Sequence, residues 1–160
     1  IEKNQITAFI GPSGCGKSTF LKTIVGKIPA LSGEYRFGTN VQIGYFDQQM
    51  AMYTSNKTVL DDFWDEYPNL TETEARNALG AFLFSGEDVF KNVNMLSGGE
   101  KVRLALCKIL KTRPNVLVLD EPTNHMDIVG KETLESMLKD YKGTRRNTKM
   151  HSRSQVPNSR

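Results

Sequence analysis

The sequence predicts an α/β fold, in which a parallel sheet carries a phosphate-binding loop and a helical subdomain is inserted at about residues 50–95. Three observations predict it. The apolar segment Ile6–Ile10 runs directly into a glycine-rich loop. The continuous apolar segment Val116–Leu119, a pattern typical of buried parallel strands, is followed by two carboxylates. Residues 50–94 between them show mostly helical spacing of their apolar side chains.

Composition indicates one soluble domain in a reducing compartment. A chain of 160 residues, 38% hydrophobic and 24% charged, is large enough for one domain with a modest core. Its two cysteines lie inside motif segments and not at the spacings of a disulfide framework, which favours a cytoplasmic location. No apolar run approaches the roughly 18 residues of a membrane span, so we expect no membrane insertion.

The formal net charge of +3 comes from the C-terminal segment. Residues 142–160 hold six of the 21 basic residues and no acidic residue, which leaves 15 basic and 18 acidic residues elsewhere, a net charge of −3. We expect residues 1–143 to form a partial domain and residues 144–160 to be a polar basic tail, disordered or non-native, because no apolar period runs through it. A nucleic-acid-binding tail is the alternative.

Two elements are predicted between the loop and the helical part. Residues from Thr19 to about Lys27 carry their apolar side chains at helical spacing, and an Ile-Pro pair at 28–29 ends that helix. Val41–Phe46 is a second strand candidate, and Asp47-Gln48-Gln49 follows its end.

Capping patterns place three further helices. Thr71 with Glu74 forms a capping box, and so does Ser97 with Glu100; the second helix ends before Pro114. Lys131 to about Tyr141 is a last helix, with a glycine at 143 to stop it. Several aromatic side chains are predicted to form the core of the helical part: Phe63, Trp64, Phe82, Phe84 and Phe90.

The loop from Gly11 to Ser18 fits the pattern G-x-x-x-x-G-K-[ST], with a strand before it and a helix after it. Glycines let successive backbone N–H groups turn toward phosphate oxygens, and the helix adds its positive end. Lys17 would reach the β- and γ-phosphates, and the Ser18 hydroxyl would bind Mg²⁺. The residues expected to contact a bound ATP here are Gly11, Ser13, Gly14, Cys15, Gly16, Lys17, Ser18 and Thr19.

The two carboxylates after Val116–Leu119 are Asp120 and Glu121. An aspartate at the end of such a strand can hold Mg²⁺ through water, and the adjacent glutamate can polarise the attacking water. We therefore expect Asp120 to act on the metal and Glu121 to be catalytic.

The segment Leu96–Glu100 predicts a second anion site. Its capping box makes it the start of a helix, and Gly98 and Gly99 leave the first N–H groups bare. One nucleotide does not easily use two complete helix ends of one subunit. We therefore expect Ser97, Gly98 and Gly99 to act in trans, on the γ-phosphate of an ATP that another subunit holds.

Together these motifs resemble the ATP-binding cassette (ABC) family of ATPases over residues 1 to about 143. The resemblance implies a P-loop core that binds ATP and Mg²⁺, and two cassettes that sandwich two ATP molecules head to tail. It also implies roles for Gln48, which matches a glutamine that contacts both Mg²⁺ and the attacking water, and for Asp127, which matches a loop between the two sites.

Other segments resemble the F family of these cassettes, especially its second cassette. They are Gly44–Gln48, Thr58–Asp62, Leu79–Phe90 and Thr123–Asp127. That family consists of soluble tandem-domain proteins that act on the ribosome, so the resemblance implies a second cassette and the ribosome as partners.

The sequence also departs from the family. The family expects strands and an adenine-stacking aromatic residue before residue 1, and a buried strand ending in Ser-His-Asp after residue 143. Residues 144–150 do not fit that strand, and we do not assign its histidine role to His151. The chain is therefore expected to be a fragment. Two alternatives stay open: the motor domain of a membrane transporter, and a remnant that binds ATP without hydrolysing it.

Overall fold

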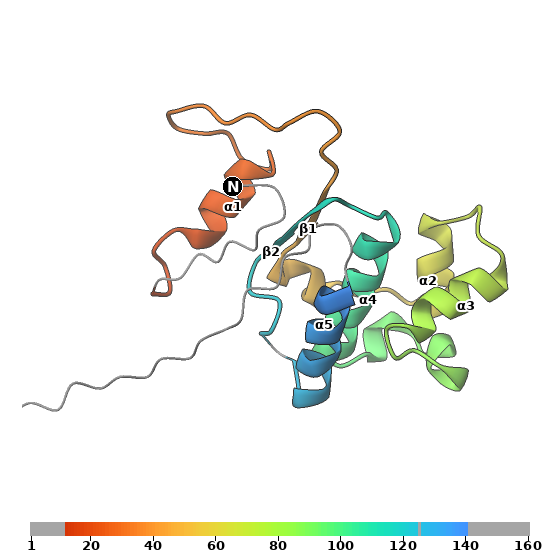
Figure 1. Ribbon diagram of the computed structural model, residues 1–160. Helices are drawn as coiled ribbons and strands as arrows, with labels where there is room; N and C mark the ends of the chain where they lie inside the picture. Colours follow the sequence, from red (N-terminus) through yellow and green to blue (C-terminus); the bar gives the residue numbers. More distant parts are fainter. Residues whose placement is uncertain (1–11, 125, 141–160) are drawn as a thin grey trace, which may run out of the picture.

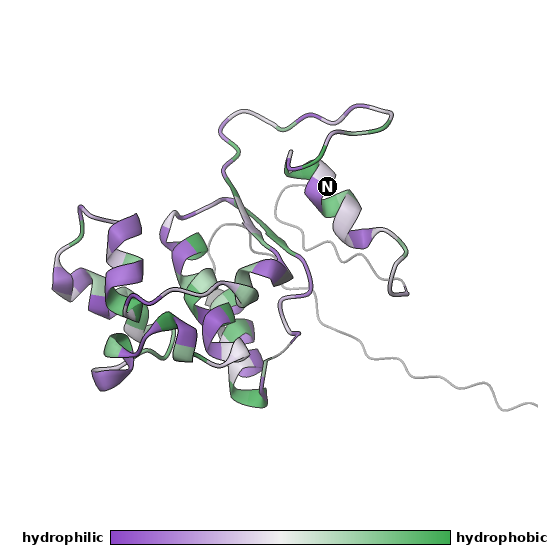
Figure 2. Cartoon of the chain, turned by 180° about the vertical axis from the view of Figure 1, so that it is seen from behind, coloured by the Kyte–Doolittle hydropathy of each residue, from purple (hydrophilic) through white to green (hydrophobic). Residues whose placement is uncertain are grey.

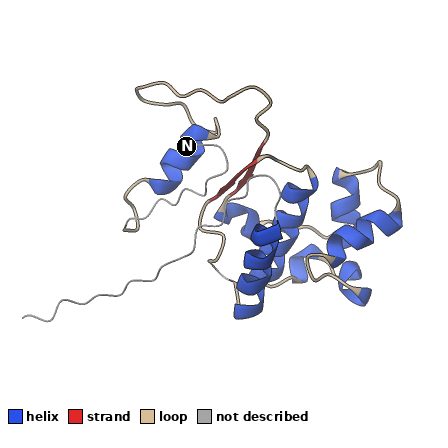
Figure 3. Cartoon of the chain, in the orientation of Figure 1, coloured by secondary structure: helices blue, strands red, loops and turns tan. Residues whose placement is uncertain are grey.

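The computed structural model describes residues 12–124 and 126–140. The predicted strand Ile6–Ile10, Gly11, His125, and everything from residue 141 onward, including His151, lie outside the described residues. Within them, helices surround a pair of parallel strands, which confirms the predicted α/β class (Figures 1 and 3). Figure 2 shows that the helices carry both hydrophilic and hydrophobic residues. No helix in this part of the chain is both long and apolar enough to cross a membrane.

The two described strands are β1 (Ile43–Phe46) and β2 (Val116–Leu119), paired in parallel with Ile43 opposite Val116 and Phe46 opposite Leu119. β1 begins two residues later than predicted. The reason is Asn115, whose side chain bonds to the backbone of Gln42 and Asn40, at 2.8 and 2.6 Å, and holds that segment beside the start of β2. The parallel register brings the carboxyl ends of both strands to the same edge.

Helix α1 (Lys17–Ile24) follows the glycine-rich loop. It begins two residues earlier and ends three residues earlier than the sequence predicts. It ends early because Gly26, at φ 78°, donates its N–H to the carbonyl of Thr23, which turns the chain out of the helix. None of its residues is fully buried. In Figure 1, α1 lies on one side of the strand pair, and helices α4 and α5 lie on the other.

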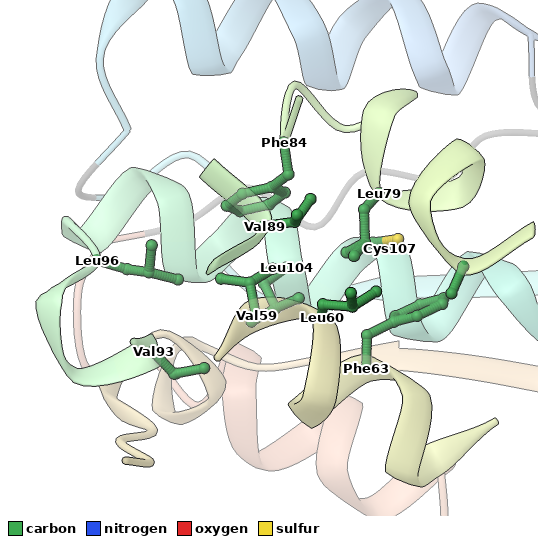
Figure 4. Close-up of a cluster of buried hydrophobic side chains, with 11 residues drawn as sticks. Val59, Leu60, Phe63, Leu79, Phe84, Val89, Val93, Leu96, Leu104 and Cys107 are labelled. Atoms are coloured by element: carbon green, nitrogen blue, oxygen red, sulfur yellow. The ribbon is translucent and has the colours of Figure 1, made fainter. Parts of the chain in front are cut away.

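The middle of the chain is built from short helices, all of which except the first pack around one core. They are η1 (Gln48–Met52), α2 (Val59–Glu66), α3 (Glu72–Gly80), η2 (Gly86–Phe90) and η3 (Val93–Met95). The capping box at Thr71 is present, and Thr58 caps α2 in a similar way. Figure 4 shows the core: Val59, Leu60, Phe63, Ala75, Leu79, Phe84, Val89, Val93, Leu96, Leu104 and Cys107.

The aromatic residues follow the prediction with one exception. Phe63 and Phe84 are fully buried in this core, and Trp64 and Phe82 pack against it. Phe90 was expected inside but is 46% exposed, because it ends the short helix η2 and its ring lies against the guanidinium of Arg76 instead.

Helix α4 (Gly98–Lys111) belongs to two cores. Leu104 and Cys107 pack among the helices described above, whereas Val102 and Leu106 pack with Phe46 of β1 in a second cluster. Helix α5 (Ile128–Asp140) covers that second cluster. It begins three residues earlier than predicted.

Candidate functional site

The described part of the glycine-rich loop has the backbone that anion binding needs. Gly14 and Gly16 have φ values of 79° and 93°, in the left-handed region that favours glycine. Gly16 is the residue that precedes α1, so the N–H groups at the start of α1 face the loop. The Lys17 ammonium donates to the carbonyl of Pro12 at 2.8 Å and lies 3.8 Å from the Cys15 sulfur. Ser13 and Thr19 are exposed beside it.

Ser18 and Asp120 meet across the fold. The Ser18 hydroxyl donates to Oδ1 of Asp120 at 2.9 Å, although 102 positions separate the two residues in the chain. Asp120 is only 6% exposed, and its backbone N–H donates to the carbonyl of Phe46 at 2.9 Å, which extends the pairing of β2 with β1 by one residue. The structure thus brings together two of the three predicted metal ligands.

The third predicted ligand, Gln48, is described only through its backbone. It is the first residue of η1, directly after Asp47 at the end of β1. Since Phe46 pairs with Leu119, Gln48 and Glu121 each lie two residues beyond a paired position at the same sheet edge.

Asp47 is a residue that the sequence reasoning missed. It is 5% exposed, accepts the backbone N–H of Gln49 at 2.9 Å, and lies 3.5 Å from the ammonium of Lys27. The adjacent Tyr45 reports the local charge. Burial first, and then the negative charges of Asp47 and Asp120, raise the pKa of the Tyr45 phenol to about 12. The signal that could have found Asp47 is its place directly after a strand, the same place that Asp120 has.

Glu121 is held in an unusual backbone conformation. Its φ of 51° lies in the left-handed region, which costs about 1–3 kcal/mol for residues other than glycine. The side-chain amide of Asn124 donates to Oε2 of Glu121 at 2.6 Å, and the backbone N–H of Asn124 donates to the Glu121 carbonyl at 3.2 Å. Asn124, also missed by the sequence reasoning, therefore fixes an exposed carboxylate at the end of β2.

The second predicted anion site is the start of α4. The Ser97 hydroxyl accepts the N–H of Glu100 at 3.3 Å, and the Glu100 carboxylate accepts the N–H of Ser97 at 2.8 Å, so the capping box is present. Partial burial raises the pKa of Glu100, but these hydrogen bonds and the nearby Lys91 outweigh it and lower the pKa overall. Ser97 and Gly98 are exposed, and Gly99 is half-buried.

The two predicted anion sites lie apart from each other in the described part of the chain. Figure 1 shows α1 and α4 on opposite sides of the strand pair, with the phosphate loop at the start of one and Ser97 at the start of the other. The start of α4 is also flanked by the exposed apolar side chain of Met95, and α5 begins with exposed Ile128 and Val129. Both groups are open to a second molecule.

Residues 1–124 match the protein family described as ABC transporter. The chain is 53% identical over 144 residues to the ATP-binding protein YdiF of Bacillus subtilis, covering 90% of this chain and 22% of YdiF. It is 42% identical to ABC transporter F family member 5 of Arabidopsis thaliana, covering 90% of this chain and 21% of that protein. It is 44% identical to the ATP-binding protein Uup of Haemophilus influenzae, covering 86% and 22%. The chain thus spans about a fifth of each of these relatives.

Solved structures show the same fold. The dimeric structure of MJ0796, a bacterial ABC transporter cassette, is 25% identical with a TM-score of 0.70, and the match covers 88% of this chain and 70% of that one. A dimeric post-hydrolysis state of the same cassette, bound to ADP and Pi, is 23% identical with a TM-score of 0.64, covering 81% and 66%.

Proposed function

Because this chain belongs to the ABC transporter family of ATP-binding domains, we propose that it is one nucleotide-binding domain, which binds and hydrolyses Mg·ATP together with a second cassette. The observation that carries this proposal is the hydrogen bond between Ser18 and Asp120, because it joins the phosphate loop to the acidic end of β2. A surface loop without a shared site would not be expected to form a hydrogen bond with the end of a distant strand.

The residues at this edge fit a magnesium ion. A serine hydroxyl and a carboxylate are the hard oxygen ligands that Mg²⁺ prefers. The buried carboxylates of Asp47 and Asp120 each follow one of the two paired strands; Lys27 lies 3.5 Å from Asp47, so a further cation would balance the charge of Asp120. No group of three His, Cys, Asp or Glu side chains in the described ranges could hold a metal by itself. Ser18 and Asp120 would therefore hold the ion together with phosphate oxygens and water, and the bound ion would neutralise charge on the phosphates.

The residues of this chain then have distinct tasks. Backbone N–H groups of the loop and Lys17 bind and orient the β- and γ-phosphates. Glu121 accepts a proton from the attacking water, and Asn124 keeps its carboxylate in one orientation. Gln48, at the same sheet edge, positions that water.

The partner in this proposal is a second cassette. Ser97, Gly98 and Gly99 present a helix N-terminus away from the chain's own phosphate loop, and the positive end of a helix favours bound anions. The exposed apolar side chains near the start of α4 and α5 give that partner a surface to bury. Solved relatives of this fold are dimeric cassettes.

The similarity to an F family member supports a role in translation. A relative named as an F family member is 42% identical to this chain, and the segments that resemble that family include the residues around Gln48 and Asn124. We therefore favour a cytoplasmic ABC-F-type protein that acts on the ribosome over the motor domain of a membrane transporter.

The test is Glu121→Gln in the complete protein. The substitution keeps the size and the Asn124 contact but removes the base, so we expect ATP hydrolysis to fall by about 10²- to 10⁴-fold while ATP binding is kept. ATP should then hold two cassettes closed, which light scattering and ribosome co-sedimentation detect. Glu132→Gln, an exposed glutamate on α5, is the matched control. Hydrolysis by Glu121→Gln at the parent rate would show that Glu121 is not the base, and a parent protein that binds ATP without turnover would select the non-hydrolysing alternative.

A further inference from the structure

The end of η1, helix α2 and the last turn of α4 meet in a polar cluster. The hydroxyl of Tyr53, the residue that ends η1, donates to Oδ1 of Asp62 on α2 at 2.9 Å. The ammonium of Lys108 on α4 lies 2.7 Å from Oδ2 of the same carboxylate and 3.0 Å from Glu66. Lys108 also lies 5.7 Å from the centre of the Tyr53 ring.

Asp62 is the centre of this cluster and has reason to keep both partners. It is 5% exposed, and a buried carboxylate is costly unless its oxygens are paired. Burial alone would lower the pKa of Lys108, but the hydrogen bonds to Asp62 and Glu66 raise it above its ordinary value, so Lys108 stays charged. The charged ammonium of Lys108 therefore forms ion pairs with Asp62 and Glu66.

The junction around the cluster is only partly filled by apolar packing, in which Met50 of η1 packs against the cluster of Val102 and Leu106 on α4. A cavity of about 670 Å³ lies between β1, η1, α2 and α4, and Tyr53, Asp62 and Lys108 all line it. Across such a hollow, the position of η1 relative to α2 depends on directed bonds more than on close contact. The Tyr53 hydroxyl supplies one such bond.

Each end of the cluster leads to one of the two anion sites. η1 begins at Gln48, next to Asp47 and the metal edge. Lys108 lies on α4 about 15 Å from Gly98, at about 1.5 Å per residue along one helix, and the hydroxyl of Tyr67 anchors the Lys108 carbonyl at 2.5 Å. A helix of this length moves as a unit, so a shift at Lys108 moves the start of α4.

We propose that Tyr53 is a positioning residue. Through Asp62 and Lys108, its hydroxyl fixes the start of α4 relative to η1, which begins at the carboxyl ends of β1 and β2. This proposal rests on the proposed function, because the start of α4 matters for hydrolysis only if Ser97 acts on a partner's ATP.

The test compares Tyr53→Phe with Tyr35→Phe in the complete protein. Both substitutions remove the hydroxyl of a half-exposed tyrosine, but Tyr35 lies in the segment between α1 and β1. We expect Tyr53→Phe to lower kcat about 5-fold, with KM for ATP within 2-fold, the loss of one hydrogen bond to a charged group. In a Ser97→Ala background the same substitution should change kcat by less than about 1.5-fold, because the start of α4 no longer contributes. Hydrogen exchange of the first turn of α4 should quicken in Tyr53→Phe alone.

Each outcome either supports or overturns the proposed role of Tyr53. A kcat loss in the parent that disappears in the Ser97→Ala background, with faster exchange at α4, supports the proposal. An equal loss in both backgrounds shows a general structural effect and overturns it, as does unchanged exchange at α4. If Ser97→Ala by itself leaves kcat at the parent value, the in-trans role of Ser97 fails, and that result is separate from the exchange measurement, which tests the link from Tyr53 to α4 without hydrolysis.

Discussion

Ser18→Ala isolates the contribution of one oxygen atom to magnesium-dependent ATP binding. The Ser18 hydroxyl donates to Asp120 at 2.9 Å. Removing it leaves the carboxylate of Asp120, a residue that is 6% exposed, without that donor, which costs about 1–3 kcal/mol of folding stability. It also removes a ligand that we assign to Mg²⁺.

The magnitude follows from the type of bond that is lost. An interaction of a hydroxyl with a charged group contributes about 1.5–3 kcal/mol, so Mg·ATP should bind about 10- to 100-fold more weakly. ATP without magnesium should bind within about 3-fold of the parent, because its phosphates contact the loop N–H groups, which the substitution keeps.

A fluorescent ATP analogue titrated with Mg²⁺ and with EDTA measures both affinities. The control is Thr23→Ala, which removes a hydroxyl from the same helix, where it donates to the backbone carbonyl of Thr19 at 2.9 Å and not to Asp120. If Ser18→Ala keeps the full gain in affinity that magnesium gives the parent, the hydroxyl is not a metal ligand and the reasoning is refuted.

Asn124→Ala should lower kcat about 10-fold with little change in ATP affinity, because the Glu121 carboxylate loses the amide that orients it at 2.6 Å; an unchanged kcat in steady-state assays would contradict this. Gly44→Ala should destabilise the fold by about 1–3 kcal/mol in urea unfolding, since the new methyl would lie 2.7 Å from two side-chain carbons, whereas Gly38→Ala, whose nearest atom is 4.0 Å away, should be close to neutral. Because the pKa of Glu100 is lowered, its cap stabilises the helix above the ordinary pKa of 4.5 and does so less as the pH falls through the folded pKa. Protection of the first turn of α4 from hydrogen exchange should therefore drop in acid, and Glu100→Gln should remove that pH dependence.

Local chemistry made several elements predictable. The capping boxes at Thr71 and Ser97 were predicted from two residues each, because a side chain that accepts an N–H three residues later acts through nearest neighbours. Both ends of β2 were predicted correctly, because a continuous apolar run can be recognised in the sequence without knowing which strand it pairs with. The early end of α1 was not predicted, because it depends on a left-handed turn at Gly26.

The site was predictable as a set of motifs but not as a set of contacts. Ser18, Asp120 and Glu121 were predicted from sequence motifs, but the contact between Ser18 and Asp120 depends on how α1 lies relative to β2, which no local pattern contains. Asp47 was missed although its place directly after a strand was a local signal, because its burial follows from the strand pairing and cannot be seen in that signal. Asn124 was missed because its partner is the side chain of Glu121, which reaches it only in a left-handed turn.

Helix α4 links the two anion sites that we propose for one chain. It begins with the Ser97 cap, and in its middle it packs on one side against Phe46, at the end of β1, and on the other side against the core of α2 and α3. A change in either core therefore reaches the start of α4 through a single rigid helix. It follows that substitutions far from any phosphate, such as those at Leu104 or Leu106, should alter how the chain acts on a partner's ATP before they alter how it binds its own.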